Sequence, residues 1–479
     1  MPVETELKLQ LEPDAIPFLE ASDLLGKAAP VVRQRSLYFD TPDQKLRAQA
    51  MSLRIRRAGR SRTQTLKGCE GQAAGLFERS EWEMPVKDDQ PKVEGLRPLI
   101  DALGKEVNGL GVIFEVRNER RTWHLRSGGS DVELVLDHGA AVVAGRTSAI
   151  NEMELELKSG QPADLFRLAR QIDAIVPVRL GVQSKAERGY DLLGPARTAF
   201  KAEALSLAKD ASVADAFRAI VHGCLRQYRL NETLFLEAPN PAALHQARVG
   251  LRRLRSAFTI FKPVLERERA ERFKTRLRDL SAVLGDARNL DVLKEKPLPP
   301  ATLSRIEEAR QAAYEKVERR LHAAESRALM LDLIEWLGDD GWFTNHELVG
   351  RPAIGFAEDR LGRLRRRIKK DGRHLARGSD SERHEVRKDA KKLRYASEFF
   401  AHLFDTPKQQ RRHGKFLKTM EKLQDDLGAL NDLATADEVI DRLGIEKSST
   451  QHIHADRHAL IRHASKAWED LIDLKRFWR

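Results

Sequence analysis

The sequence is poor in the residues that define several classes of protein. Only two of its 479 residues are cysteines, Cys69 and Cys224, which excludes a disulfide framework and a cysteine-based zinc site. No apolar run is long enough to cross a membrane. The first charged motif begins at residue 4, so we expect no signal peptide before it. These absences predict a protein of the reducing cytoplasm without a membrane partner.

Positive charge is concentrated in the second half of the chain. The sequence has 84 Lys and Arg residues against 72 Asp and Glu residues, a formal net charge of +12. Residues 1–200 contain 29 of each kind, so residues 201–479 carry the entire excess. A chain of this length is expected to form two or three domains. The uneven charge indicates that the two halves of the chain have different functions, and that the second half binds a polyanion.

Alternating apolar and polar residues predict an N-terminal region built mainly of strands. The predicted strands are 1–9, 33–40, 52–57, 62–67, 77–86, 113–125, 131–143 and 151–157. Helices are predicted over 13–26, 91–104 and 161–175. About eight strands with small helical insertions favour a closed antiparallel barrel or a strongly curved sheet.

In strand after strand, one predicted face carries charges of both signs and the other is apolar, because residues two apart share a face. Clear examples are the rows Glu4–Glu6–Lys8, Arg54–Arg56 and Glu152–Glu154–Glu156. The bland interpretation is the solvent face of a one-sided sheet. The functional interpretation is a charged cavity with two walls. Carboxylates on one wall suit Mg²⁺ or Mn²⁺, and basic residues on the other suit phosphate oxygens. Such an arrangement can hydrolyse a phosphoanhydride.

Several motifs occur in order over residues 1–195. They are Glu4-x-Glu6-x-Lys8, Tyr38-Phe39-Asp40-Thr41-Pro42, Leu53-Arg54-Ile55-Arg56, the glutamate-rich strand near 154 and Ser184-Lys185-Ala186-Glu187-Arg188-Gly189-Tyr190. This set resembles the CYTH domain, a family also called the triphosphate tunnel metalloenzymes. The resemblance implies an eight-stranded tunnel barrel that binds a triphosphate and a divalent metal, Mg²⁺ or Mn²⁺.

The resemblance also implies roles for individual residues. The implied metal ligands are Glu4, Glu6, Asp137, Glu154 and Glu156, and which two of Glu152, Glu154 and Glu156 bind the metal stays open. The implied catalytic, phosphate-holding residues are Lys8, Arg54, Arg56, Lys67, Arg120 and Lys185, with Arg79 and Arg188 as further substrate-binding candidates.

Substrates in this family are inorganic triphosphate, thiamine triphosphate and ATP, the last in an adenylate cyclase reaction. The sequence has no clear pocket for adenine or thiamine. Inorganic triphosphate is therefore the expected substrate, and the chain is expected to be an inorganic triphosphatase. The alternative from another class is a non-catalytic protein that only binds polyphosphate and targets partners to it.

From residue 205 onward the sequence predicts long helices, after a linker at 191–210. The expected breaks are 237–241, 285–289, 297–300, 338–352, 371–381 and 405–407. An eleven-residue pattern that begins at His245 recurs at His384, and residues 284–291 recur more loosely as 427–433. This internal repeat predicts two related helical bundles, about 205–340 and 355–479.

One helix in each predicted bundle carries a cationic stripe opposite its apolar face. The stripes are His245, Arg248, Arg252 and Arg255 in the first copy and His384, Arg387, Lys391 and Arg394 in the second. A solvated surface is the bland interpretation. Neither stripe contains a carboxylate, however, so each repels itself unless an anion is near. Nucleic acid is the less favoured ligand because the stripes offer almost no aromatic residues for base stacking.

The repeated pattern H-x-x-R-x-x-x-[RK]-[RK]-L-R resembles the CHAD domain, an α-helical domain often found behind CYTH. The resemblance covers about 205–479 and implies two four-helix bundles with a basic surface that binds inorganic polyphosphate. It adds Arg253 and Lys392 to the stripe residues, and Asn289 stands where that family more often has Asp. The expected fold is thus α+β, a barrel followed by an all-α domain. Association with cytoplasmic polyphosphate granules is a further expectation.

Overall fold

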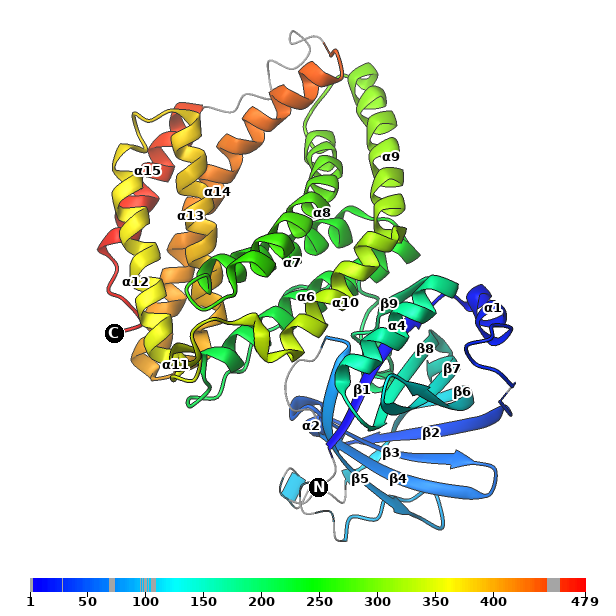
Figure 1. Ribbon diagram of the computed structural model, residues 1–479. Helices are drawn as coiled ribbons and strands as arrows, with labels where there is room; N and C mark the ends of the chain where they lie inside the picture. Colours follow the sequence, from blue (N-terminus) through cyan, green and yellow to red (C-terminus); the bar gives the residue numbers. More distant parts are fainter. Residues whose placement is uncertain are drawn as a thin grey trace. The chain divides into compact units, whose positions relative to one another are not determined.

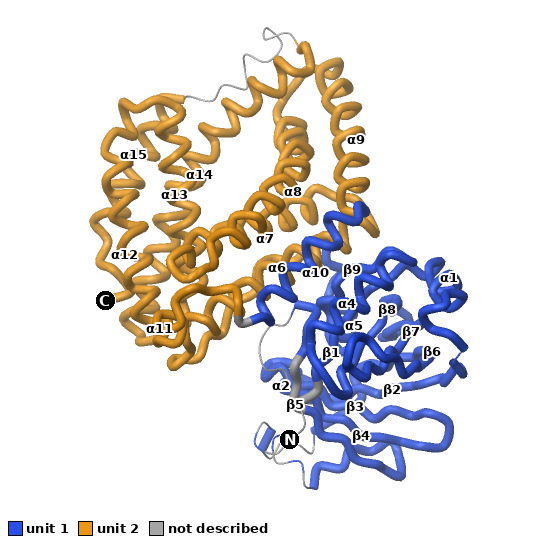
Figure 2. The backbone as a smooth tube through the Cα atoms, in the orientation of Figure 1, with its two compact units in different colours: residues 1–198, 322–339 blue, residues 199–321, 340–479 orange. Residues whose placement is uncertain are grey.

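The structure is a computed structural model (Figure 1) that describes residues 3–27, 29–68, 74–94, 96, 98, 101, 103, 104, 109–445 and 457–479. The chain forms two compact units, coloured separately in Figure 2. The first combines residues 1–198 with 322–339, and the second combines residues 199–321 with 340–479. No helix in the described part of the chain is long and apolar enough to cross a membrane.

The first unit is an antiparallel barrel. Its strands are β1 (Val3–Leu11), β2 (Val32–Asp40), β3 (Met51–Ala58), β4 (Ser61–Gly68), β5 (Leu76–Pro85), β6 (Gly111–Ser127), β7 (Ser130–Val143), β8 (Arg146–Ser159) and β9 (Val178–Leu180). They pair in the order β5-β4-β3-β2-β6-β7-β8-β1-β9, and an additional pairing of β5 with β1 closes the first eight strands into a ring. The predicted eight-stranded antiparallel fold is confirmed.

The alternation seen in the sequence divides these strands into two faces. Leu53 and Ile55 of β3 are buried in an apolar cluster with Phe39 of β2 and Leu66 of β4. Arg54 pairs across the ladder with Tyr38 and Thr65, so the polar residues of these three strands share the other face. Because side chains alternate along each strand, the apolar residues lie on one side of the sheet and the charged ones face together.

Short helices cover the barrel: α1 (Ile16–Glu20), α2 (Lys45–Ala48), α4 (Pro162–Ile175) and α5 (Lys185–Leu193). α4 matches its predicted range and packs on β1, β6 and β8. The helix predicted over 13–26 is shorter, a 3₁₀ turn followed by α1. Much of the helix predicted over 91–104 lies outside the described residues.

One helix of the first unit comes from far along the chain. α10 (Ala324–Gly338) packs against α4 and β9. Arg170 of α4 donates to Asp332 at 2.9 Å, and Arg327 of α10 donates to Asp173 at 2.6 Å. This contact could not be predicted from the sequence, because complementary charges 162 and 154 residues apart have no local signature.

The described part of the second unit consists of helices and the loops that join them. Its helices are α6 (Val213–Glu237), α7 (Pro241–Ile260), α8 (Arg267–Lys294), α9 (Pro300–His322), α11 (His346–Val349), α12 (Ala353–Asp371), α13 (Asp380–Phe399), α14 (Pro407–Arg442) and α15 (Arg457–Asp473). Helix α8 runs without interruption through 285–289, so the break predicted there is wrong. Gly285 and Asn289 are weak helix formers, but the flanking leucines 284, 290 and 293 are buried and packing outweighs that weakness.

The internal repeat is visible as two equivalent sets of helices, with α7 corresponding to α13 and α8 to α14. Phe261 follows α7 as Phe400 follows α13, and their rings meet with centroids 5.9 Å apart. Arg252 of α7 donates to the Tyr395 hydroxyl of α13 at 2.8 Å, which also holds the two helices together. The predicted all-α second half is confirmed, whereas its division into bundles at about 205–340 and 355–479 stays a prediction.

Candidate functional site

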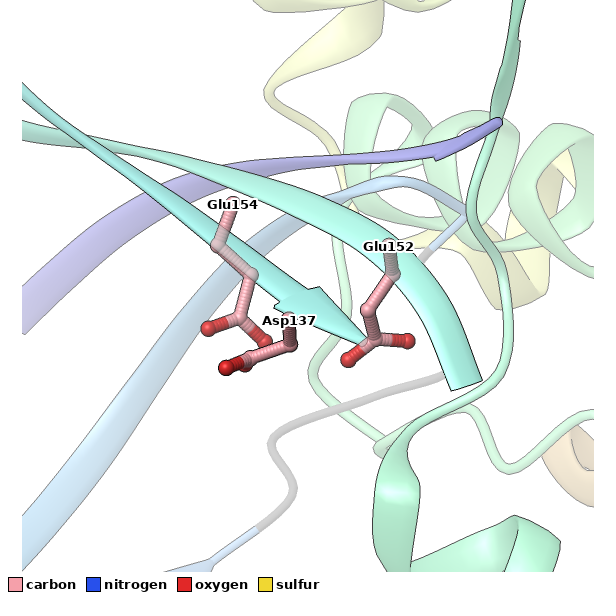
Figure 3. Close-up of side chains that lie close together, drawn as sticks. All are labelled: Asp137, Glu152 and Glu154. Carbon is pink, nitrogen blue, oxygen red and sulfur yellow. The ribbon is translucent and has the colours of Figure 1, made fainter. Parts of the chain in front are cut away.

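Three buried or partly buried carboxylates meet inside the first unit. Asp137 lies on β7, and Glu152 and Glu154 lie on the neighbouring strand β8 (Figure 3). One oxygen of each comes within 4.8 Å of the others. Asp137 and Glu152 are direct cross-strand partners, and Glu154 follows two residues later on the same face. The sequence analysis proposed Asp137 and Glu154 as metal ligands and left Glu152 open, and the fold brings all three together.

Cations surround this carboxylate cluster. Lys185 of α5 contacts all three members, at 2.8 Å from Asp137, 2.9 Å from Glu154 and in a close ion pair with Glu152. Lys8 of β1 lies 3.2 Å from Glu152 and 2.9 Å from Glu154. Arg120 of β6 binds both oxygens of Asp137, at 2.9 and 2.6 Å. Buried charges of this kind need such partners, because an unpaired one loses its hydration without compensation.

These contacts change the pKa values of the groups involved. Burial acts against every charged form, but Lys185 and Lys8 reverse its effect and hold the pKa of Glu154 well below its usual value. For the same reason Asp137 and Glu152 have lowered pKa values. Burial alone would lower the pKa of Lys185, whereas the three carboxylates raise it well above the ordinary value. The cluster is therefore fully ionised at neutral pH, with three negative charges facing three positive ones.

Two buried acidic groups, one beside this cluster and one within it, bear on metal binding. Glu6 of β1 is buried, yet it forms no hydrogen bond or salt bridge with any described residue. The Oε2 atom of Glu152 is also buried and has no hydrogen-bond partner within the described chain. Buried anionic oxygens are normally paired or bound to a metal ion. These two groups therefore fit a hard divalent cation, which prefers carboxylate oxygens.

Two further acidic residues, Glu156 and Glu4, were proposed as metal ligands from the sequence. Glu156 of β8 is only partly buried, forms an ion pair with Lys158 and is not one of the three clustered carboxylates. The side chain of Glu4 lies outside the described residues, although its backbone pairs with that of Arg79 across β1 and β5. The side chain of Arg79 likewise lies outside the described residues.

The basic wall lies on β3 and β4, as the alternation predicts. Arg56 forms a salt bridge with Glu83 at 3.3 Å, and Lys67 with Glu81 at 2.8 Å. The nearby guanidinium of Arg54, followed by burial, lowers the pKa of Arg56 to about 10. The buried Nε of Arg54 has no hydrogen-bond partner among the described residues. These cations repel one another and offer donors to an anion.

The position of Lys185 depends on packing around α5. Ser184 and Glu187 form a capping box that starts the helix. A Cβ on Gly189 would lie 2.2 Å from the Phe114 ring, so glycine is needed for α5 to approach β6. The Tyr190 hydroxyl donates to Asp40 at 2.7 Å. Asp40 also accepts two backbone N–H bonds that start α2, so this part of the Tyr38–Pro42 motif positions α5. Arg188 is buried in the same helix, and its Nε has no partner in the described chain.

A second candidate site lies in the helical unit, where the two cationic stripes face a common cavity of about 310 Å³. Its basic lining residues are His245, Arg248, Arg252, Arg288, Lys296, Arg387, Lys391 and Arg394. Arg288 of α8 and Lys296, which follows the end of that helix, were missed by the sequence analysis, because only the fold shows that they face the stripe. Two carboxylates, Asp425 and Asp432, also reach the cavity.

Not every predicted anion-binding residue lines this basic pocket. Arg253 is buried in an ion pair with Glu398, with its guanidinium over the Phe399 ring. Lys392 donates to Asp389 one turn earlier, at 2.9 Å. His384 is exposed, and its Nδ1 lies 2.8 Å from the Asn431 amide oxygen. Arg255, the last residue of the first stripe, is likewise not among the lining residues.

The pocket has a strong excess of positive charge. Burial and then the neighbouring guanidiniums lower the pKa of Lys391 to about 6 and that of His245 to about 4. The same two causes lower the pKa of Arg248 to about 10. These basic groups have lowered pKa values because they are buried and repel one another. A bound anion would supply the negative charge that stabilises their protonated forms.

Comparison with known proteins finds a matching domain family for each half of the chain. The CYTH domain family matches residues 2–190, and the CHAD domain family matches residues 219–441. The chain carries a CYTH domain followed by a CHAD domain.

One curated relative is an inorganic triphosphatase of Haemophilus influenzae. It is 32% identical to this chain over 196 residues, which cover 40% of this chain and 55% of the relative. The chain thus matches only about half the length of that protein.

Two solved structures resemble parts of the chain. The CHAD domain of the plant Ricinus communis is 28% identical, with a TM-score of 0.48 over 59% of this chain and 98% of that one. A Hippeastrum protein described as having a dominant triphosphatase activity is 21% identical, with a TM-score of 0.33 over 39% of this chain and 95% of that one.

Proposed function

We propose that the CYTH domain is a metal-dependent inorganic triphosphatase. The observation that carries this proposal is the carboxylate cluster of Asp137, Glu152 and Glu154 inside the barrel, in which the buried Oε2 of Glu152 has no hydrogen-bond partner within the described chain. The similarity of the first half to an inorganic triphosphatase supports it. The charged groups of the interior, which suit phosphate and metal, support a substrate rich in phosphate.

In this proposal the acidic residues of the interior bind the metal and the basic residues bind the phosphate. Glu6 and the β8 carboxylates would hold a Mg²⁺ or Mn²⁺ ion, with Asp137 in the same cluster and Glu4 as the remaining proposed ligand. The ion would supply charge neutralisation and a template for the phosphate oxygens. The proposal holds for Mg²⁺ or Mn²⁺, and for any pair of the β8 glutamates as ligands.

The basic residues hold and polarise the substrate in this proposal. Arg54 has a free buried donor, and Arg56 and Lys67 lie on the same wall, where they stabilise charge on the transferring phosphoryl group. Lys8, Arg120 and Lys185 bind carboxylates and can turn toward phosphate when a metal neutralises those carboxylates. Arg188 and Arg79 are the further substrate-binding candidates. Water attacks the terminal phosphorus, and pyrophosphate leaves.

The test is phosphate release from inorganic triphosphate, thiamine triphosphate, ATP and long-chain polyphosphate, with Mg²⁺, with Mn²⁺ and with chelator. We expect metal-dependent turnover that is fastest with inorganic triphosphate. Glu6→Gln should remove most of it. Glu119→Gln is a matched control, because Glu119 lies on the outer face of β6 in an exposed pair with Arg33. Full activity of the Glu6 variant would refute the proposal, and no turnover of any substrate would favour a binding protein instead.

For the CHAD domain we propose binding of inorganic polyphosphate in the basic pocket. The carrying observation is the convergence of both cationic stripes on one cavity, where the cations lower each other's pKa values. A ligand made only of phosphate matches a pocket that lacks aromatic residues for stacking. Displacement of labelled polyphosphate by nucleic acid at equal phosphate concentration and moderate salt would contradict this assignment. Cytoplasmic location and association with polyphosphate granules belong to the same proposal.

A further inference from the structure

Two lysines, Lys296 and Lys391, line the basic pocket. Lys391 of α13 is half-buried among the lining residues, and it forms no hydrogen bond or salt bridge within the described chain. The other lysines nearby on the same helix behave differently. Lys392 lies 2.9 Å from Asp389, and Lys388 forms an ion pair with Glu385. Lys391 is thus set apart from neighbours of the same chemistry and nearly the same sequence position.

The groups that face Lys391 come from three helices. Arg248 and Arg252 lie on α7, Arg387 lies one turn earlier on α13, and Asp432 lies on α14. Burial and the three guanidiniums lower the pKa of Lys391 to about 6, against a smaller opposing effect of Asp432. Its amine is therefore mostly unprotonated near pH 7.5, and an unprotonated amine is a nucleophile.

We propose that Lys391 is a site of covalent acylation by small anionic acyl donors, of which acyl phosphates are the chemical class. The inference rests on the proposed anion-binding function of the pocket. The guanidiniums of Arg248, Arg252 and Arg387 attract the phosphate end of the donor, which raises its local concentration beside the amine. The cavity of about 310 Å³ is large enough for such a small molecule.

The reaction needs no other reactant. The Nζ lone pair attacks the carbonyl carbon of the acyl phosphate, and the bond between that carbon and the phosphate oxygen breaks. Inorganic phosphate leaves with the electron pair, and the amine loses one proton to solvent as the amide forms. The product carries no charge at position 391. The pocket therefore loses an amine whose protonated form a bound polyanion would otherwise favour.

The experiment treats the full-length protein with acetyl phosphate at pH 7.5 and measures the acetylation rate of each lysine by tandem mass spectrometry. Lys392 and Lys388 are internal controls on the same helix. We expect acetylation of Lys391 to be about tenfold faster than that of Lys392. The unprotonated fraction of a lysine at its ordinary pKa is only ~0.1% at this pH, although a less basic amine is also a weaker nucleophile. Excess inorganic triphosphate should protect Lys391 and leave the controls unchanged.

Equal rates at Lys391 and Lys392, or fast acetylation of Lys391 that triphosphate does not slow, would overturn the inference. Polyphosphate binding is measured on the same preparation. If polyphosphate binds while Lys391 is no more reactive than Lys392, the acylation site fails and the proposed function stands. If Lys391 reacts selectively and polyphosphate does not bind, the acylation site stands and polyphosphate is the wrong ligand.

Discussion

The Lys185 ammonium lies 2.8 Å from Oδ2 of Asp137 and also contacts Glu152 and Glu154, so it occupies the centre of the carboxylate cluster. A metal ion bound by all three carboxylates needs that same position. Under the proposed function, metal binding there would require Lys185 to move, and the phosphate of the proposed substrate is the group toward which it would move. The same lysine stabilises the metal-free cluster and can serve the substrate.

Removal of this ammonium should destabilise the metal-free protein. Lys185→Met leaves three buried carboxylates with fewer cations, and loss of one partner of a buried ion pair costs about 3–5 kcal/mol. Urea unfolding in chelator measures the loss, and Mn²⁺ should restore part of it. Lys158→Met is the control, since this exposed lysine pairs with Glu156 and its loss should cost at most about 1 kcal/mol. Equal losses in both variants would contradict the prediction.

A second prediction separates the glutamates of β8. Glu152→Gln should weaken Mn²⁺ binding by at least about 10- to 100-fold, the range seen when even indirect supports of a metal site are removed. Glu156→Gln should have a smaller effect, because Glu156 already pairs with Lys158. Calorimetric titration of each variant with Mn²⁺ gives the comparison. A larger effect at Glu156 would instead favour the ligand set implied by the CYTH resemblance.

A third prediction concerns the basic pocket. Arg248→Gln should weaken polyphosphate binding by about tenfold and reduce the slope of log affinity against log salt by roughly one. Arg363→Gln is a suitable control, because Arg363 is exposed on α12 and pairs with Asp359 four residues earlier. Fluorescence anisotropy at several salt concentrations measures both quantities. Equal effects of the two substitutions would indicate a diffuse surface instead of a pocket.

The lowered pKa of Lys391 predicts a pH-dependent stability. The folded state holds this pKa at about 6, against an ordinary value of 10.5 in the unfolded chain. Between these values the unfolded state binds more protons, so the contribution of Lys391 to the free energy of unfolding rises with pH. Lys391→Met should therefore raise the melting temperature most at pH 6 and progressively less toward pH 10. A gain independent of pH would argue against the lowered pKa.

The same titration affects binding. A polyanion favours the protonated amine, so its binding takes up a proton above pH 6 and its affinity should fall as pH rises to 9. Lys391→Arg, which stays charged, should flatten this profile. Binding curves at pH 6, 7.5 and 9 check the expectation.

The C-terminal residues should be essential for the stability of the helical unit. Phe477 and Trp478 are fully buried, and the Phe477 ring packs on Phe404 and Phe416. Burial of large aromatic side chains is worth about 3–5 kcal/mol each, so deletion of residues 477–479 should cause a large loss of stability by urea unfolding. Lys475→Ala is the control, as its exposed side chain should matter little.

The sequence by itself determined the elements and the types of chemistry. Alternation of apolar and charged residues defined the strands and placed Lys8, Arg54 and Glu154 on charged faces, because a strand's side chains alternate whatever it packs against. The eleven-residue repeat likewise defined α7, α13 and their cationic stripes. These are local properties, fixed by residues a few positions apart.

Only the tertiary structure decided which charges meet. Closure of β1 on β5 and the packing of α5 put Lys185 among Asp137, Glu152 and Glu154, and the pairing of Arg253 with Glu398 separated it from the stripe it adjoins in sequence. It also left Lys391 without a hydrogen-bond or salt-bridge partner among the described residues, beside a Lys392 that pairs with Asp389. The physical reason is that burial and the distance to other charges determine how a charged group behaves, and both depend on segments far apart in the chain.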